Sequence, residues 1–195
     1  MLIYRVGKVI CYLYFKLVHR LTVEGKEHFP KKNGVLLCSN HLSYLDPPLL
    51  GVASPRKIRF MAKSELFSIP LFNSLITTLG AFPVKRGLSD KQALRSGIEI
   101  LNNGEVMGIF PEGTRSKTGK LGPGLAGAGF FALRSNAVVV PCLIAGSYRP
   151  FKKVKVIFGK PIDFSAKEKR ISAKEAAEII MEHIRDLVEE EKRNI

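Results

Sequence analysis

The segment GVLLCSNHLSYLDPP, Gly34 to Pro48, joins a short apolar run to a polar loop. The run Gly34–Ser39 has the length and the aliphatic content of a buried strand. The loop that follows contains His41 and Asp46, five positions apart. Because loops at the carboxyl ends of strands usually carry the sites of α/β domains, the segment predicts a central strand and a candidate site together.

Short apolar runs alternate with helical patterns on both sides of this segment. The alternation predicts an α/β fold, a single domain with a central mixed β-sheet flanked by helices. Strands are expected at Leu21–Glu24, Gly34–Ser39, Lys57–Met61, Val106–Phe110, Ala137–Ile144 and Val154–Phe158.

Two capping boxes predict where helices begin. Ser89 with Gln92 is expected to open one helix, which Gly104 closes. Ser172 with Glu175 is expected to open the last helix, whose apolar face carries Ala176, Ile180, Ile184 and Leu187.

Residues 1–20, MLIYRVGKVICYLYFKLVHR, have the periodicity of an amphipathic helix, and residues 21–195 are expected to form the domain. Charges interrupt the segment too often for a membrane span. One helical face carries Leu2, Val6, Val9, Leu13 and Leu17, and another carries Arg5, Lys8, Lys16 and Arg20. Two interpretations fit: a basic helix in contact with a membrane, and a core-packed helix with a solvated basic side.

The stretch Leu66–Val84 contains nineteen residues without a formal charge. Pro70 and several polar residues argue against a membrane span. A buried helix is the first expectation, and a membrane-dipping element or the wall of an acyl-chain site are the alternatives.

The formal net charge is +14, from 31 Lys and Arg against 17 Asp and Glu. Such a charge favours polyanionic partners: nucleic acid, anionic lipid or phosphorylated substrates. No basic stripe interleaved with aromatic residues is present, so nucleic acid is not expected as a partner. The three cysteines, Cys11, Cys38 and Cys142, lack zinc-ligand spacing, which favours a reducing cytoplasmic setting without a metal.

His41 and Asp46 suit general base catalysis. An imidazole takes up a proton near neutral pH, and a carboxylate on its other nitrogen fixes the tautomer and stabilises the imidazolium. A structural interpretation also fits, because Asp46 precedes Pro47 and resembles a helix N-cap, and His41 then has only a structural role.

The second constellation is FPEGTRS, Phe110 to Ser116, again after an apolar run. Its backbone N–H groups and the guanidinium of Arg115 can hold a phosphate, while Glu112 binds a substrate hydroxyl or holds Arg115 in place. An ordinary polar turn would also account for Gly113 and Thr114.

The third constellation is GAFPVKRG, Gly80 to Gly87, where Lys85 and Arg86 could clamp an anionic headgroup. Without the other motifs, this segment fits equally well with two solvated cations on a loop. Lys63, in MAKSELF, is a weaker candidate.

Two motifs are interpreted as structural. A literal GxGxxG at Gly122, Gly124 and Gly127 contains Pro123 and follows no strand directly, so a loop opening a helix is expected there. Cys38 lies inside an apolar strand, which favours a buried, inert thiol.

The chain resembles the glycerolipid acyltransferase family, and most closely its lysophosphatidate acyltransferases. The resemblance rests on the four blocks of the family's signature, which occur here in order as NHLSYLD, GAFPVKRG, FPEGTRS and VVVPCLIAG. The similarity covers roughly Leu21 to Phe164. The resemblance implies that His41 and Asp46 form a catalytic dyad. It also implies that the acceptor's phosphate and glycerol portion is bound by Arg86, Glu112, Gly113, Thr114 and Arg115, with Lys63 as a secondary candidate.

The function implied is transfer of an acyl group from acyl-CoA or acyl carrier protein to the sn-2 hydroxyl of 1-acyl-glycerol 3-phosphate, giving phosphatidic acid. His41 would deprotonate that hydroxyl, and no cofactor, metal or acyl-enzyme is required. The expected location is the inner face of the cell membrane, with an anionic membrane surface as partner.

Two alternatives remain open: another acceptor, such as glycerol 3-phosphate or a different lysophospholipid, and a catalytically silent lipid-binding protein. One departure from the family pattern is visible at Leu121-Gly122-Pro123-Gly124, where a basic residue often precedes the glycine. A contribution of that charge to binding is not expected in this chain.

Overall fold

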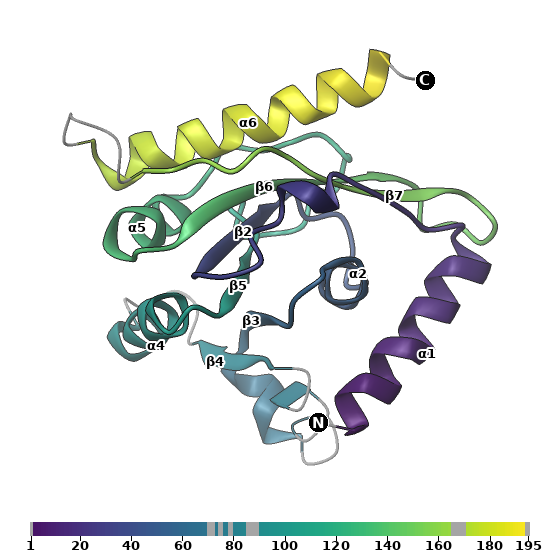
Figure 1. Ribbon diagram of the computed structural model, residues 1–195, viewed down its shortest axis with the longest axis horizontal. Helices are drawn as coiled ribbons and strands as arrows, with labels where there is room; N and C mark the ends of the chain where they lie inside the picture. Colours follow the sequence, from purple (N-terminus) through teal and green to yellow (C-terminus); the bar gives the residue numbers. More distant parts are fainter. Residues whose placement is uncertain are drawn as a thin grey trace.

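The computed structural model describes residues 2–69, 73, 76–77, 80–84, 90–164 and 171–193. Helices and strands alternate along the chain (Figure 1). The elements are α1 (Leu2–Val18), β1 (Thr22–Glu24), the 3-10 helix η1 (Lys26–His28), β2 (Val35–Ser39), α2 (Asp46–Ala53), β3 (Ile58–Lys63), the 3-10 helix η2 (Ser64–Ser68), β4 (Phe82–Val84), α4 (Lys91–Asn102), β5 (Val106–Ile109), α5 (Ala126–Arg134), β6 (Val138–Gly146), β7 (Val154–Phe158) and α6 (Ala173–Arg193).

The strands form one seven-stranded sheet in the order β1-β7-β6-β2-β5-β3-β4. Neighbouring strands are parallel except β6 and β7, which are antiparallel and joined by a short connection. The α/β fold with a mixed sheet is therefore confirmed.

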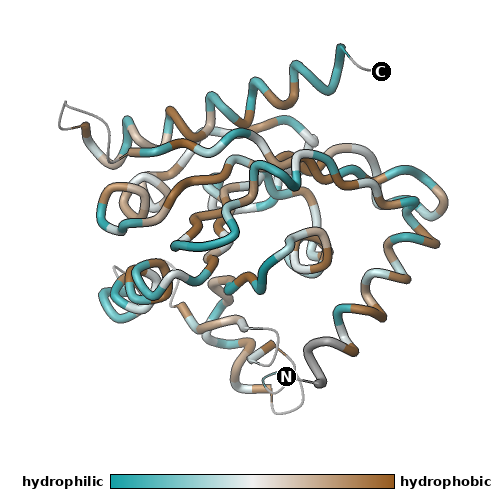
Figure 2. The backbone as a smooth tube through the Cα atoms, in the orientation of Figure 1, coloured by the Kyte–Doolittle hydropathy of each residue, from teal (hydrophilic) through white to brown (hydrophobic). Residues whose placement is uncertain are grey.

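The central strand β2 is buried along its whole length, because helices cover both faces of the sheet. Val35 and Leu37 pack on one face with residues of α1 and α2, whereas Leu36 and Cys38 pack on the other face with α4, α5 and α6. Figure 1 shows these two helical layers, and Figure 2 shows the apolar strands between them. The sheet thus holds the loop after β2 in a fixed position.

All six strands expected from the sequence are present, and their ends differ from the expected ones by at most two residues. The seventh, β4, was not expected, because Pro83 lies at its centre and proline cannot donate to a sheet. Among the described strands, β4 pairs with β3 alone and forms the edge of the sheet, where proline is tolerated.

The prediction of one buried helix over Leu66–Val84 is wrong for the part of the stretch that is described. It begins in η2 and ends in β4, and Asn73, Ile76 and Thr77 between them are helical. An apolar run of this length does not by itself distinguish one helix from several short elements.

The helix starts were partly predicted. Ser172 and Glu175 form the expected reciprocal capping box at the start of α6, with backbone-to-side-chain distances of 2.7 and 3.2 Å. The N-cap of α4 is Asp90, whose carboxylate accepts from the N–H of Ala93. This corrects the expected cap, Ser89, which lies outside the described residues. Gly104 follows α4 at φ 77°, as expected for a helix-closing glycine.

Helix α1 turns its apolar face away from the sheet. Val6, Val9, Leu13 and Leu17 are 49–71% exposed. Lys8 instead reaches inward to the carbonyl of Ser54, and burial lowers its pKa. The core-packed interpretation of this face is therefore wrong. Within the described residues, no helix is both long and apolar enough to cross a membrane.

Candidate active site

The loops after β2 and β5 meet at the carboxyl ends of two neighbouring parallel strands. Cys38 pairs with Ile109 in the register of the sheet, so the chain leaves both strands at the same level. Two hydrogen bonds then join the loops. The N–H of His41 donates to Glu112 Oε1 over 3.1 Å, and the N–H of Ser116 donates to the carbonyl of His41 over 2.8 Å.

His41 and Asp46 are in direct contact. The distance between His41 Nδ1 and Asp46 Oδ2 is 2.7 Å, and the Asp46 side chain is fully buried. The same oxygen accepts from the N–H groups of Leu42 and Ser43, at 2.6 and 2.8 Å. These bonds hold the Asp46 carboxylate against Nδ1 of His41.

The alternative of Asp46 as a helix N-cap is wrong in its details. Asp46 is the first residue of α2, the cap position is Leu45, and no side chain caps there. All four hydrogen bonds to the Asp46 carboxylate come from outside α2. The positive end of the helix dipole still favours its negative charge.

The Asp46 contact sets the tautomer of His41. Because an ionised carboxylate only accepts, the proton shared with it is on Nδ1, which leaves a lone pair on Nε2. The ring stacks on Phe110 with centroids 3.9 Å apart and an interplanar angle of 13°. The His41 side chain is 14% exposed, so the imidazole is held by two partners and remains accessible.

Tyr148, in the connection after β6, was not found by sequence reasoning. Its hydroxyl donates to Asp46 Oδ1 over 2.6 Å. Burial and the charge of Asp46 both raise the pKa of Tyr148, so the phenol stays protonated. The two residues are 102 positions apart, and no local pattern links them.

Asn40, the residue before His41, was also missed. Its side-chain amide donates to the carbonyl of Ile144 and accepts from its N–H, at 2.9 and 2.7 Å. This pair of bonds extends the pairing of β2 with β6 by one side chain. It anchors the backbone from which His41 projects.

Glu112 holds backbone rather than Arg115. Besides His41, it accepts from the N–H of Gly122 through Oε2 at 2.8 Å, and it is 9% exposed. The guanidinium of Arg115 instead lies over the exposed ring of Tyr44, 3.5 Å from its centroid. The expectation that Glu112 holds Arg115 in place is therefore not met.

The turn at Gly113 requires glycine. Gly113 has φ 67°, in the left-handed region, and a Cβ there would clash with the side chain of Leu125. Thr114 and Arg115 follow it as exposed residues. The structure thus brings Gly113, Thr114 and Arg115 onto the loop that Glu112 ties to His41.

Two predicted site residues are not joined to this cluster. Lys63 is exposed at the end of β3, two strands away from β2, and in the described part of the chain it makes no hydrogen bond or ion pair with the dyad. Arg86 lies outside the described residues.

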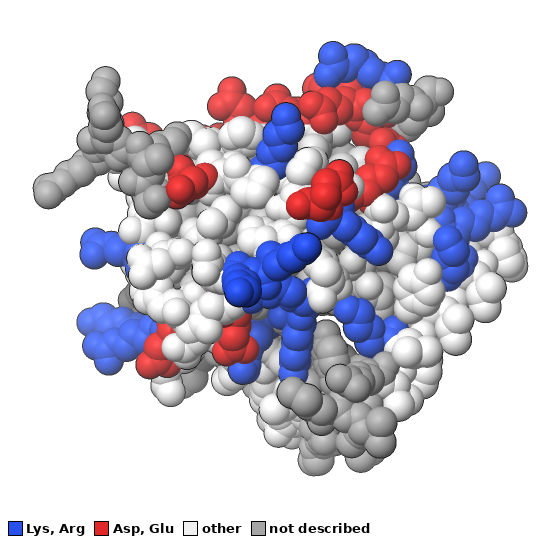
Figure 3. Space-filling view, in the orientation of Figure 1, with Lys and Arg blue, Asp and Glu red and all other residues white. Residues whose placement is uncertain are grey.

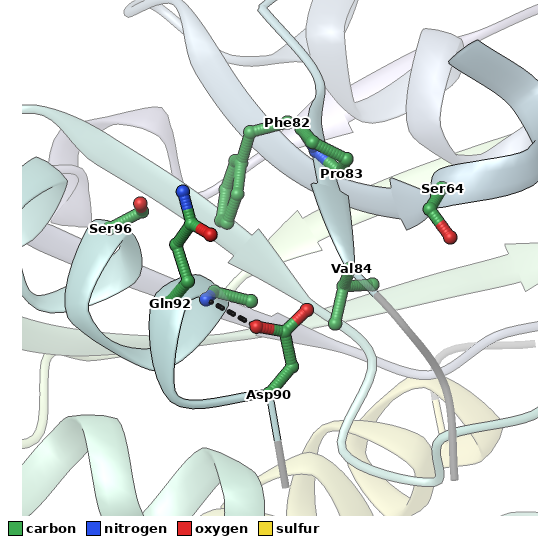
Figure 4. Close-up of a pocket in the computed structure, with 8 residues that line it drawn as sticks. Ser64, Phe82, Pro83, Val84, Asp90, Gln92 and Ser96 are labelled. Atoms are coloured by element: carbon green, nitrogen blue, oxygen red, sulfur yellow. Dashed lines mark hydrogen bonds between the residues drawn. The ribbon is translucent and has the colours of Figure 1, made fainter. Parts of the chain in front are cut away.

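A cavity of about 240 Å³ lies beside the ends of β4 and α4 (Figure 4). Its polar groups are those of Ser64, Asp90, Gln92 and Ser96, and Phe82 to Val84 form an apolar wall. No residue of the dyad lines it, so it is separate from the reactive pair.

The motifs interpreted as structural behave as expected. Gly122 and Gly124 lie in a loop that opens α5. Cys38 is fully buried, and burial raises the pKa of its thiol. Among the described residues, no cluster of three or more His, Cys, Asp or Glu side chains could hold a metal ion.

Comparison with known proteins gives consistent matches. The family model described as Acyltransferase matches residues 20–145. A 1-acyl-sn-glycerol-3-phosphate acyltransferase of Bacillus subtilis is 35% identical over 146 residues, 72% of each chain. The chloroplastic enzyme LPAT1 of Arabidopsis thaliana is 31% identical over 74% of this chain and 44% of its own length.

A solved structure has the same fold. The crystal structure of the 1-acyl-sn-glycerophosphate acyltransferase PlsC from Thermotoga maritima superposes with a TM-score of 0.72 at 29% identity. The match covers 95% of this chain and 78% of that one.

Proposed function

The chain belongs to the acyltransferase family, and we propose that it transfers a fatty acyl group from an acyl thioester to the sn-2 hydroxyl of 1-acyl-sn-glycerol 3-phosphate. The product is phosphatidic acid, and the donor is acyl-CoA or acyl carrier protein. The observation that carries this proposal is the 2.7 Å contact of His41 with a buried Asp46, tied by Glu112 to the FPEGTRS loop.

His41 acts as the general base. Nε2 takes the proton of the acceptor hydroxyl as its oxygen attacks the thioester carbonyl, and Asp46 stabilises the imidazolium that forms. The C–S bond then breaks, and the departing thiolate takes the proton from Nε2. The thioester is already activated and the hydroxyl is the nucleophile, so the transfer needs no acyl-enzyme.

The FPEGTRS loop positions the acceptor. The Arg115 guanidinium and the exposed turn at Gly113 and Thr114 bind its phosphate, because Arg offers bidentate donors. Lys63, exposed at the end of β3, and Arg86, the cation of the GAFPVKRG motif, add positive charge to the acceptor site. Holding the hydroxyl beside Nε2 turns a bimolecular encounter into an oriented one, which contributes much of the rate.

Acceptor specificity gives the decisive test. Release of free thiol from acyl-CoA is followed with lysophosphatidate, glycerol 3-phosphate, lysophosphatidylcholine or no acceptor. The proposal expects fast release with lysophosphatidate alone, together with formation of phosphatidic acid. Equal release without an acceptor would mean a thioesterase, and preference for glycerol 3-phosphate would overturn the acceptor assignment.

The apolar face of α1 supports peripheral binding to a membrane, at the inner face of the cell membrane. Val6, Ile10, Leu13 and Leu17 are all at least 49% exposed on one side of the helix. Such a face gains free energy when it is buried in the interface of a bilayer. Leu17→Glu should weaken co-sedimentation with lipid vesicles, whereas Asn136→Glu, beyond the end of α5, should not. Equal effects of the two variants would contradict this contact.

A further inference from the structure

The connection between β6 and β7 lies against the end of α1. Residues 147–153, SYRPFKK, form this connection, which we call the hairpin tip. The N–H of Phe151 donates to the carbonyl of Val18 over 2.6 Å, and the N–H of Val154 donates to that of His19 over 2.9 Å. Figure 1 shows the tip beside the last turn of α1. The tip and the helix therefore form one continuous surface.

The hairpin tip holds an aromatic ring out into solvent. Phe151 is 68% exposed, next to a helix end where Leu17 is 71% exposed. Its φ of 63° lies in the left-handed region, which is unfavourable for a bulky side chain. Such outliers persist where the surroundings impose them, and they gather at functional sites. The exposed ring extends the apolar face of α1 beyond the helix.

Three cations belong to the same tip as Phe151, and a fourth, Arg20, follows the end of α1. Arg20, Arg149, Lys152 and Lys153 are exposed, and none of them makes an ion pair with another described residue. The tip contains no acidic residue. By contrast, Lys155, two positions further on, is neutralised by Glu24 and Glu191. The positive charge of the tip is thus available to an external anion.

Acidic residues gather elsewhere on the molecule. Seven of the chain's 17 Asp and Glu residues lie on α6. Figure 3 shows acidic atoms along α6 and a separate basic group where the hairpin tip meets α1. This separation would turn the tip toward an anionic surface and α6 away from it.

We propose that the hairpin tip is a second membrane contact, in which Phe151 enters the interface while Arg149, Lys152 and Lys153 bind the headgroups of anionic lipids. The proposal rests on the lipid acceptor of the proposed function and extends the contact made by α1. An acidic protein partner would use the cations, but it would not explain an exposed phenyl ring continuous with an apolar helix face. Combining an apolar anchor with a basic patch is what makes peripheral binding stable.

The expected effects follow from the charges and the ring. Each cation near an anionic membrane strengthens binding by about 1 kcal/mol, or about fivefold, so losing all three should weaken binding roughly 100-fold. Phe151→Asn removes the ring while keeping a residue that tolerates positive φ, so this variant should fold normally. Phe151→Asn should weaken vesicle binding to a similar extent. This loss should depend less on salt concentration, because the phenyl ring carries no charge.

The experiment measures co-sedimentation of the full chain with vesicles of phosphatidylcholine, with and without phosphatidylglycerol. The variants are the triple R149Q/K152Q/K153Q and F151N. The control R95Q/R134Q/K174Q removes the same charge from exposed positions on α4, α5 and α6. We expect the first triple to lose its preference for phosphatidylglycerol and the control to keep it. Equal binding by the two triples would overturn the proposal.

Activity separates this inference from the proposed function. Both tip variants should keep wild-type turnover with lysophosphatidate in detergent micelles and lose it when the acceptor is in vesicles. Absence of turnover by the wild type in micelles would instead defeat the proposed function. Unchanged vesicle binding with a raised KM for acyl carrier protein would overturn the lipid assignment in favour of an acidic protein.

Discussion

The backbone N–H of His41 donates to Glu112 Oε1 over 3.1 Å, so the acidic residue of one motif fixes the backbone of the other. The second oxygen of Glu112 accepts from Gly122 at the far end of the same loop. One carboxylate therefore sets the distance between the dyad and the loop assigned to the acceptor. This gives Glu112 a structural role in the loop after β5, although its side chain does not hold Arg115.

Glu112→Gln should disrupt this arrangement. An amide offers one acceptor oxygen and a donor NH₂, so one of the two backbone N–H groups loses its partner. A buried unsatisfied donor costs about 1–3 kcal/mol of unfolding free energy. We expect that loss in a denaturant titration, together with a fall in kcat. Glu99→Gln, on the exposed side of α4, is the matched control, and equal stability of the two variants would refute the assignment.

Tyr148→Phe tests the support of the dyad. Removing the hydroxyl leaves the buried Asp46 carboxylate without one of its donors, and bonds to charged groups contribute about 1.5–3 kcal/mol. We expect kcat to fall while KM stays near that of the wild type, because Tyr148 acts through Asp46. Tyr12→Phe, on the exposed face of α1, should change neither. A purely structural role would lower stability and leave kcat unchanged.

The same pair predicts a pH dependence of stability. The pKa of Tyr148 is raised in the folded state above its unfolded value of about 10. A raised pKa means that its contribution is fully present below pH ~10 and declines as the pH rises above that value. The difference in unfolding free energy between wild type and Tyr148→Phe should therefore narrow above pH ~10. A difference that stays constant into that range would contradict the assignment.

The sequence predicted those elements that are specified by a pattern of neighbouring residues. β2 and β5 are apolar runs ending in polar loops, and parallel strands bring such loops to the same edge. Ser172 and Glu175 formed the capping box that their spacing indicated. Each of these signals lies within a few residues, which is why it could be read without a structure.

The missed features depend on contacts over long distances along the chain. Tyr148 meets Asp46 across 102 positions, and Asn40 meets Ile144 across 104. The three-residue strand β4 contains Pro83, which argues against a strand until its place at the sheet edge is known. The outward direction of the apolar face of α1 likewise depends on which side packs against the sheet.

Arg115→Gln should affect acceptor binding more than chemistry. The exposed guanidinium lies over Tyr44 and is free to pair with a phosphate, and one such charged contact is worth about 1.5–3 kcal/mol. We expect the KM for lysophosphatidate to rise roughly 10-fold or more by that magnitude, with a smaller change in kcat. Lys117→Gln, in the same loop, is the charge-matched control. A fall in kcat alone would place Arg115 at the reacting atoms instead.

His41→Ala tests the central claim most directly. Thiol release from acyl-CoA is measured with lysophosphatidate, and the thermal unfolding of the variant is compared with that of the wild type. General base catalysis contributes about 10²–10⁴-fold, so turnover should fall by that factor in a protein that still folds. Near-normal, acceptor-dependent turnover by folded His41→Ala would contradict the account.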